Sequence, residues 1–269
     1  MNQPTSKSEF VAAAGGVNVA KDGASPTDSG STASWFDHWP YPLWIAHRGA
    51  GKRAPENTLA AFRLGASHGY RAFECDVKLS ADGVPFLLHD DTLERTTNGS
   101  GIAGHQRWSA LSRLDAGSWH GRTFSGEPPP SLEAIASFAL HNGFAINLEI
   151  KPTTGLALET GREVARMAKR LWSKSNSESV ASKLGRAPES FARPPLLPLL
   201  TSFQPHALQG AREAAPDLPR GLLLSEWHEG WLDQALALGC VAVVAAVDIL
   251  DAGTIGTLHK HRLRALSYT

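Results

Sequence analysis

From residue 35 onward, short apolar runs that suit buried strands alternate with longer segments of helical periodicity. The apolar runs fall at residues 44–47, 71–79, 144–151, 197–203, 221–224, 240–247 and 264–269. The first helix is expected at residues 56–68 and should stop at Gly69. The second is expected at residues 131–143, with Ser131 as its N-cap. A third is expected at residues 156–172. Strands that alternate with helices are connected in parallel, so the pattern predicts a barrel or a doubly wound sheet.

One predicted hairpin gathers two acids and a histidine. Glu74 and Asp76 are two residues apart in a strand-like run, so their side chains point to the same face, while Cys75 points to the other. The turn signal at residues 80–83 folds the chain back and brings His89 roughly opposite the two acids. Two carboxylates and an imidazole at one place are typical of a metal site with acid–base chemistry.

Composition excludes several classes of partner. Lys plus Arg and Asp plus Glu both number 26, so no net charge favours nucleic acid or an anionic membrane. No apolar run approaches the ~20 residues of a membrane-spanning helix. Cys75 and Cys240 lie in apolar runs and are expected to be buried free thiols of a reducing compartment.

Residues 1–34 are polar and rich in small side chains, so we expect a disordered tail rather than a signal peptide. A cytoplasmic protein is therefore expected ahead of a periplasmic or secreted one. The main domain should span residues 35–269, with the polar, proline-containing stretch 173–195 as an inserted loop.

Motifs along the chain resemble those of the glycerophosphodiester phosphodiesterase family. They occur in order as HRG, PENT, E-x-D, a DG turn, HD and RTT between residues 47 and 97, followed by DAGSW, NLEIKP, TSFQPHAL and RGLLL. The resemblance covers about residues 38–269 and is closest to bacterial cytoplasmic members associated with glycerol-3-phosphate uptake. It implies a TIM-type (β/α)₈ barrel of the phospholipase-C-like phosphodiesterase kind.

The chain departs from the family at its last strand. Family members continue beyond the position of Tyr268–Thr269 into a further helix and an eighth strand, whereas this sequence stops there. A barrel that lacks a strand has two unpaired edges. Either the chain is truncated or another segment closes the barrel.

Three acids are the expected metal ligands. Barrel enzymes carry their catalytic groups at the C-terminal ends of the strands, where Glu74, Asp76 and Glu149 are expected. Taken singly, each could be an ordinary solvated or ion-paired carboxylate. Together they favour a hard divalent cation, Mg²⁺ or Ca²⁺, and the resemblance implies the same ligand set.

Two histidines are the expected acid and base. His47 and His89 flank the acids, and imidazole titrates near neutral pH, although a structural histidine is an alternative for either one. Their order of action stays open, and Asp90 is expected to orient His89 or its loop.

Four further residues are expected to contact the substrate. Arg48 and Lys151 are candidate phosphate-binding cations, although Lys151 could equally pair with a neighbouring acid. Phe203 and Tyr268 could pack on the glycerol end or belong to the core. Residues 55–58 (PENT) are expected to start a helix, with Glu56 behind the site.

The resemblance implies hydrolysis of small glycerophosphodiesters to sn-glycerol 3-phosphate and an alcohol. Two alternatives stay open. One is a lysophospholipid-directed phosphodiesterase, which should carry an exposed apolar ridge that residues 92–130 do not suggest. The other is a catalytically silent barrel that binds a ligand or partner. The missing strand is the argument for this alternative. The oligomeric state is unknown.

Overall fold

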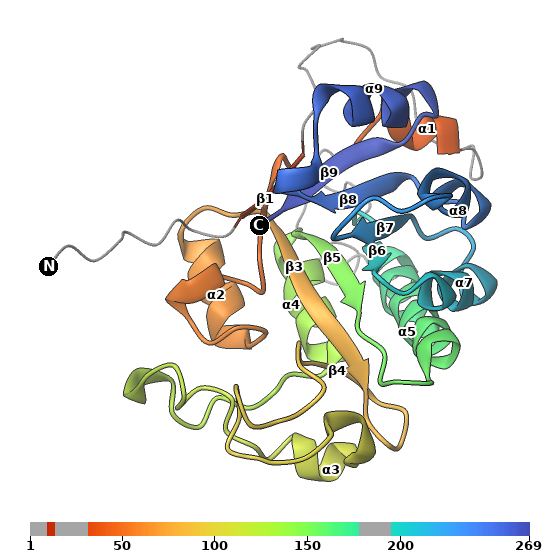
Figure 1. The fold of residues 1–269 in the computed structure, drawn as a ribbon. Helices are drawn as coiled ribbons and strands as arrows, with labels where there is room; N and C mark the ends of the chain where they lie inside the picture. The colour runs from red at the N-terminus through yellow and green to blue at the C-terminus, as the bar shows by residue number, and fades with distance from the viewer. Residues whose placement is uncertain (1–9, 14–31, 178–194) are drawn as a thin grey trace, which may run out of the picture.

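The computed structural model describes residues 10–13, 32–177 and 195–269, which form a curled sheet covered by helices (Figure 1). The described residues contain seven strands that run parallel in barrel order. These are β2 (Trp44–Ala46), β3 (Ala72–Leu79), β5 (Ala145–Ile150), β6 (Leu199–Ser202), β7 (Arg220–Leu224), β8 (Ala242–Ala246) and β9 (Arg264–Tyr268). The predicted TIM-type barrel short of one parallel strand is therefore confirmed.

A short strand from the beginning of the chain lies in the gap of the barrel. Strand β1 (Phe10–Ala13) runs antiparallel to both of its neighbours, with Val11 opposite Ile45 of β2 and Ala12 opposite Ser267 of β9. Its two pairings complete a continuous ring of strands, because β2 also pairs with β3. A segment other than a parallel eighth strand thus occupies the seam.

This strand lies within the 34 residues for which a disordered tail is expected, so the expectation does not hold at Phe10–Ala13. Helix α1 (Thr32–Asp37) also begins inside that stretch. The remaining tail residues, 1–9 and 14–31, lie outside the described residues. The same is true of residues 178–194 of the expected insertion, whose first part belongs to helix α5 (Ala157–Ser177).

The other helices pack around the sheet or lie in its connections. They are α2 (Leu59–Ser67), α3 (Trp108–Leu111), α4 (Leu132–Asn142), α7 (Pro205–Ala214), α8 (Trp231–Ala237) and α9 (Ala252–Lys260). Helix α4 follows the prediction, since Ser131 accepts a hydrogen bond from Ala134 N and Gly143 ends the helix in a left-handed conformation. Among the described residues no helix combines the length and apolar character needed to cross a membrane.

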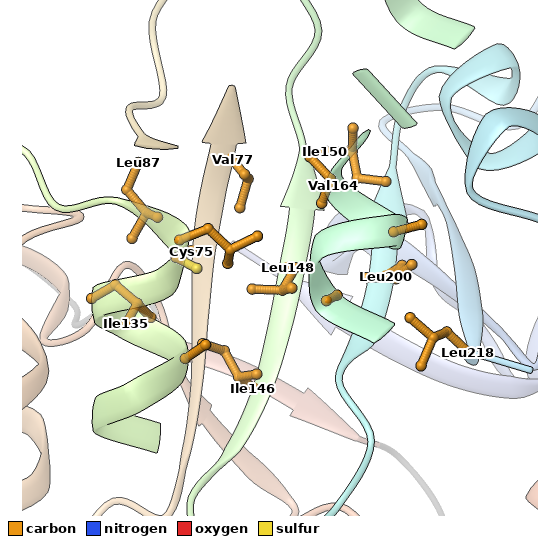
Figure 2. Close-up of a cluster of buried hydrophobic side chains, with 14 of the residues drawn as sticks. Cys75, Val77, Leu87, Ile135, Ile146, Leu148, Ile150, Val164, Leu200 and Leu218 are labelled. Atoms are coloured by element: carbon orange, nitrogen blue, oxygen red, sulfur yellow. The ribbon is translucent and has the colours of Figure 1, made fainter. Parts of the chain in front are cut away.

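The outward faces of the central strands form the main hydrophobic core. Figure 2 shows side chains from β3, β5 and β6 packed against helices α4 and α5. Cys75 and Val77 of β3 and Leu148 of β5 belong to this cluster. Because strand side chains alternate, the residues between them face the interior of the barrel.

The antiparallel strand β4 (Pro85–Leu87) pairs with the end of β3 and forms the predicted hairpin. Leu88 N donates to Asp76 O at 3.1 Å, which fixes the chain immediately before His89. The following segment, up to Pro130, contains α3 and turns, as its lack of periodicity predicts.

Candidate active site

Three carboxylates from two adjacent strands meet inside the barrel. Parallel pairing of β3 with β5 places Asp76 beside Glu149, and Glu74 lies two residues before Asp76 on the same face. One oxygen of each lies within 4.8 Å of the others, and all three residues are buried. Within the described part of the chain, Glu74 Oε1, Asp76 Oδ1 and Glu149 Oε1 accept no hydrogen bond. Buried carboxylate oxygens that accept no hydrogen bond fit a cation.

The proton affinities of these acids reflect their crowding. Burial, followed by the charges of Asp76 and Glu149, raises the pKa of Glu74 well above its usual value. Burial and the charge of Asp76 raise the pKa of Glu149 to about 7. Burial would also raise the pKa of Asp76, but nearby cations, chiefly Arg48, hold it below its usual value. The cluster therefore has excess negative charge for a hard divalent cation to neutralise.

Two histidines flank the carboxylates from different loops. His47 follows β2, and its Nε2 lies 3.8 Å from Glu74 Oε2. His89 follows β4, and its Nδ1 lies 2.7 Å from Asp90 Oδ1. Asp90 therefore holds the His89 ring through Nδ1, as the sequence suggests.

Arg48 makes several contacts with the carboxylates. Its backbone N–H donates to Glu74 Oε2 at 3.0 Å, its Nη1 donates to Glu56 Oε1 at 2.8 Å, and its Nε lies 3.1 Å from Asp76 Oδ2. The residue adopts φ 50°. This left-handed conformation is unfavourable for an arginine and typical of a constrained functional loop.

Lys151 adds a second positive charge on the β5 side. Its Nζ lies 2.8 Å from Glu149 Oε1, an ion-pair distance without the angle of a hydrogen bond, and 3.9 Å from Asp76 Oδ1. The same Nζ is 5.3 Å from the centre of the Phe203 ring, within cation–π range. The ion pair considered from the sequence is thus present at the cavity.

A cavity of about 320 Å³ opens above the carboxylates. Phe203 and Tyr268 form part of its wall, edge to face, with ring centres 5.8 Å apart. The cavity is lined by His47, Arg48, Glu74, His89, Asn147, Glu149, Lys151, Phe203, Leu223, Val244, Tyr268 and Thr269. Eight of the nine residues expected at the site are in this lining, and the ninth, Asp76, is fully buried in the carboxylate cluster.

Asn57 is a supporting residue that sequence reasoning did not single out. Its Nδ2 donates to Asp76 Oδ2 at 2.8 Å, and its Oδ1 accepts from Asp76 N at 3.1 Å. The PENT motif that contains Asn57 is the available signal, although by itself it predicts a helix start and a supporting role for Glu56 rather than a contact to Asp76. Helix α2 begins later, at Leu59 with Thr58 as its N-cap, because Asn57 adopts φ 59°.

Lys78 was also missed. It lies on the inward face of β3 after Glu74 and Asp76, and its side chain is 2% exposed. Its Nζ donates to Asp91 Oδ1 at 2.7 Å and lies 3.5 Å from the Lys151 carbonyl oxygen. The period-two spacing Glu74, Asp76, Lys78 in β3 was the signal for an inward-facing lysine. Through these contacts the buried lysine connects the His89 loop with the end of β5.

A family model and curated proteins match most of the chain. The model described as "Glycerophosphoryl diester phosphodiesterase family" matches residues 47–269. A glycerophosphodiester phosphodiesterase of Caldanaerobacter subterraneus is 32% identical over 201 residues, 73% of this chain and 74% of that protein. A relative from Bacillus subtilis is 36% identical over 229 residues, 84% of each chain.

Solved structures show the same fold. A phosphodiesterase from Oleispira antarctica, solved in complex with the product sn-glycerol-3-phosphate, is 32% identical, with a TM-score of 0.68 over 84% of this chain and 83% of that one. The glycerophosphodiester phosphodiesterase of Agrobacterium tumefaciens is 24% identical and has a TM-score of 0.54 over 82% of this chain and 93% of that one. Since the family model and these relatives cover most of the sequence, this chain is an enzyme of the glycerophosphoryl diester phosphodiesterase family.

Proposed function

We propose that the protein hydrolyses glycerophosphodiesters to sn-glycerol 3-phosphate and an alcohol, with His47 and His89 as the acid–base pair. The observation that carries the proposal is the meeting of two imidazoles and three carboxylates at one cavity. The product complex of the Oleispira antarctica relative supports the same product here.

In the first step, the glycerol 2-hydroxyl attacks phosphorus while one histidine accepts its proton. The bond between phosphorus and the alcohol oxygen breaks, and the other histidine gives a proton to that oxygen. Arg48 and Lys151 stabilise the negative charge that spreads over the phosphoryl oxygens. The products are a free alcohol and a cyclic glycerol phosphate.

In the second step, the histidines exchange roles. Water attacks phosphorus and loses a proton to the histidine that has become basic, and the bond from phosphorus to the 2-oxygen breaks. That oxygen takes a proton from the other histidine, which restores the starting state. Phe203 and Tyr268 pack against the glycerol carbons and hold the 2-hydroxyl in line.

Glu74, Asp76 and Glu149 would hold a divalent cation, and Mg²⁺ or Ca²⁺ suits this all-oxygen donor set. When bound, the cation supplies charge stabilisation to the phosphoryl group and lowers the pKa of the attacking hydroxyl.

The test is hydrolysis of glycerophosphocholine by the purified protein with Mg²⁺, with Ca²⁺ and after chelation. We expect turnover that chelation abolishes, and a loss of at least about 10²-fold in kcat for His47→Ala and His89→Ala, the lower range for a positioned acid or base. Exposed His141, on helix α4, gives the control His141→Ala. Wild-type turnover below detection with both metals, or near-normal kcat in either histidine variant, would contradict the proposal.

The same assay separates the alternatives. A silent barrel would turn over no diester. A lysophospholipid-directed enzyme would prefer lysophosphatidylcholine over glycerophosphocholine. Cytoplasmic location stays a prediction from the sequence, which cell fractionation would test.

A further inference from the structure

Arg95 lies outside the cavity lining and yet joins two of its supporting carboxylates. Its Nε and Nη2 donate to Asp90 at 2.5 and 2.9 Å, and its Nη1 and Nη2 donate to Glu56 at 2.8 Å each. The guanidinium thus binds both carboxylates in a forked geometry, which lysine cannot reproduce.

Each carboxylate continues to a different part of the candidate site. Asp90 contacts Nδ1 of His89, and Glu56 accepts from Nη1 of Arg48. Arg48 in turn contacts the metal-site acids through its backbone and its side chain. A continuous chain of charged contacts therefore runs from the His89 imidazole through Arg95 to the loop that carries His47 and Arg48.

Arg95 also balances the charge between the two loops. Hydrogen bonds from Arg95 are the first cause of the strongly lowered pKa of Asp90. Burial alone would raise the pKa of Glu56, but hydrogen bonds from Arg95 and the charges of Arg48 and Arg95 keep it below its usual value. Without the guanidinium, two carboxylates that share one partner would repel each other.

We propose that Arg95 is a positioning residue that aligns both His89 and Arg48. By holding Asp90 against Nδ1, it keeps the His89 tautomer with a proton on Nδ1 and Nε2 toward the substrate. By holding Glu56, it fixes the Arg48 guanidinium beside the phosphate position. The inference rests on the proposed function, because it assigns these two residues to proton transfer and phosphate binding.

The kinetic test compares Arg95→Met, Arg95→Lys and the control Arg107→Met with the wild type on glycerophosphocholine. The Arg107 side chain is 75% exposed, and its Nε lies 3.8 Å from Asp82 Oδ2. For Arg95→Met we expect kcat to fall by about 10- to 100-fold, as when a supporting partner of a functional residue is removed, with a raised KM. Arg95→Lys should recover only part of the loss, and Arg107→Met should match the wild type.

Double variants show whether Arg95 acts through its partners. Asp90→Asn should lower mainly kcat and Glu56→Gln should raise mainly KM. Combined with Arg95→Met, each should cost less than the sum of the single effects, because the pairs share one interaction. Additive losses, or values of kcat and KM in folded Arg95→Met within about twofold of the wild type, would contradict the proposal.

A spectroscopic measurement separates this inference from the proposed function. Long-range ¹H–¹⁵N spectra of the imidazoles report the tautomer of His89, assigned with His89→Ala. We expect the Nδ1–H tautomer in the wild type and a mixture in Arg95→Met. An unchanged His89 signal overturns the role of Arg95 even if the wild type turns over no diester, whereas wild-type inactivity alone overturns only the proposed function.

Discussion

At the scale of single residues, the metal-site carboxylates depend on Asn57 for their placement. This buried side chain makes two hydrogen bonds with Asp76 from a left-handed backbone conformation, which asparagine tolerates better than most residues. Its removal takes away the acceptor of the Asp76 N–H and one of the donors that contact Asp76 Oδ2, which Arg48 Nε also approaches at 3.1 Å.

We therefore predict that Asn57→Ala lowers the free energy of unfolding by about 2–3 kcal/mol, the cost of stranding buried polar groups, and weakens Mg²⁺ binding. Urea unfolding and calorimetric titration measure the two effects. Asn142→Ala is the matched control, because exposed Asn142 donates to the Phe138 carbonyl near the end of α4, far from the carboxylates in the sequence. Equal stability of the two variants would show that the contacts to Asp76 contribute little.

The acids also predict how pH affects metal binding. The Glu149 pKa of about 7 means that this side chain is protonated below neutral pH and ionised above it. Since a cation binds the carboxylate form, Mg²⁺ affinity should rise as pH increases, by about tenfold per pH unit below 7 if one proton is released.

The stability of the metal-free protein should fall, rather than rise, as pH increases. A raised carboxyl pKa in the folded state contributes stability below the unfolded value of 4.5, and that contribution is lost as pH rises through about 7. Melting temperatures with chelator and with Mg²⁺ should therefore diverge as pH increases. Parallel curves would mean that Glu149 is not part of the cation site.

At the scale of elements, strand periodicity accounts for most of what sequence reasoning could place. Alternation within β3 puts Glu74 and Asp76 inside and Cys75 in the outer core, and the turn brings β4 back beside them. These are local patterns of period two. The chain of contacts through Arg95 escaped prediction because Glu56 and Arg95 meet only after two irregular loops have folded.

Helix α2 supports the loop that carries His47 and Arg48. A Cβ placed on Gly65 would lie 2.2 Å from the Gly49 carbonyl oxygen, too close for any real contact. The close approach of this helix to the loop therefore requires glycine at Gly65.

Gly65→Ala should destabilise the protein by about 1–3 kcal/mol through overpacking and should lower kcat by shifting the loop. Gly256→Ala in helix α9 is the matched control, because its added methyl meets open space and alanine favours helix. That variant should gain up to about 1 kcal/mol. Thermal unfolding measures the stability of both variants, and glycerophosphocholine turnover measures kcat. If both variants were more stable than the wild type, the loop at Gly49 would have to move aside at no cost.

At the scale of the whole molecule, barrel closure depends on strand β1. The sequence predicted the seven parallel strands, because each is an apolar run between helices. It did not predict β1, because FVAA is short and weakly apolar and its partners in β2 and β9 are remote along the chain. Long-range backbone pairing of so short a segment leaves no periodic signal.

We predict that removal of residues 1–13 lowers the melting temperature by several degrees, since about 1 kcal/mol corresponds to about 2–4 °C in a chain of this size. Removal of residues 1–9 retains β1 and is the control. Differential scanning calorimetry compares the two. Identical melting temperatures would mean that β1 adds nothing to the closure of the ring.

The position of β1 has an uneven effect on the catalytic groups. Its neighbour β2 leads directly into His47, whereas the three carboxylates are carried by β3 and β5, away from the β1 seam. Fraying at this junction would loosen the loop that carries His47 and Arg48 and would leave intact the β3–β5 pairing that holds the three carboxylates together. A chain without β1 should therefore still bind Mg²⁺ while its turnover of the diester falls sharply. Metal affinity and catalysis share one cavity, yet loss of a strand that contributes no side chain to that cavity would separate them.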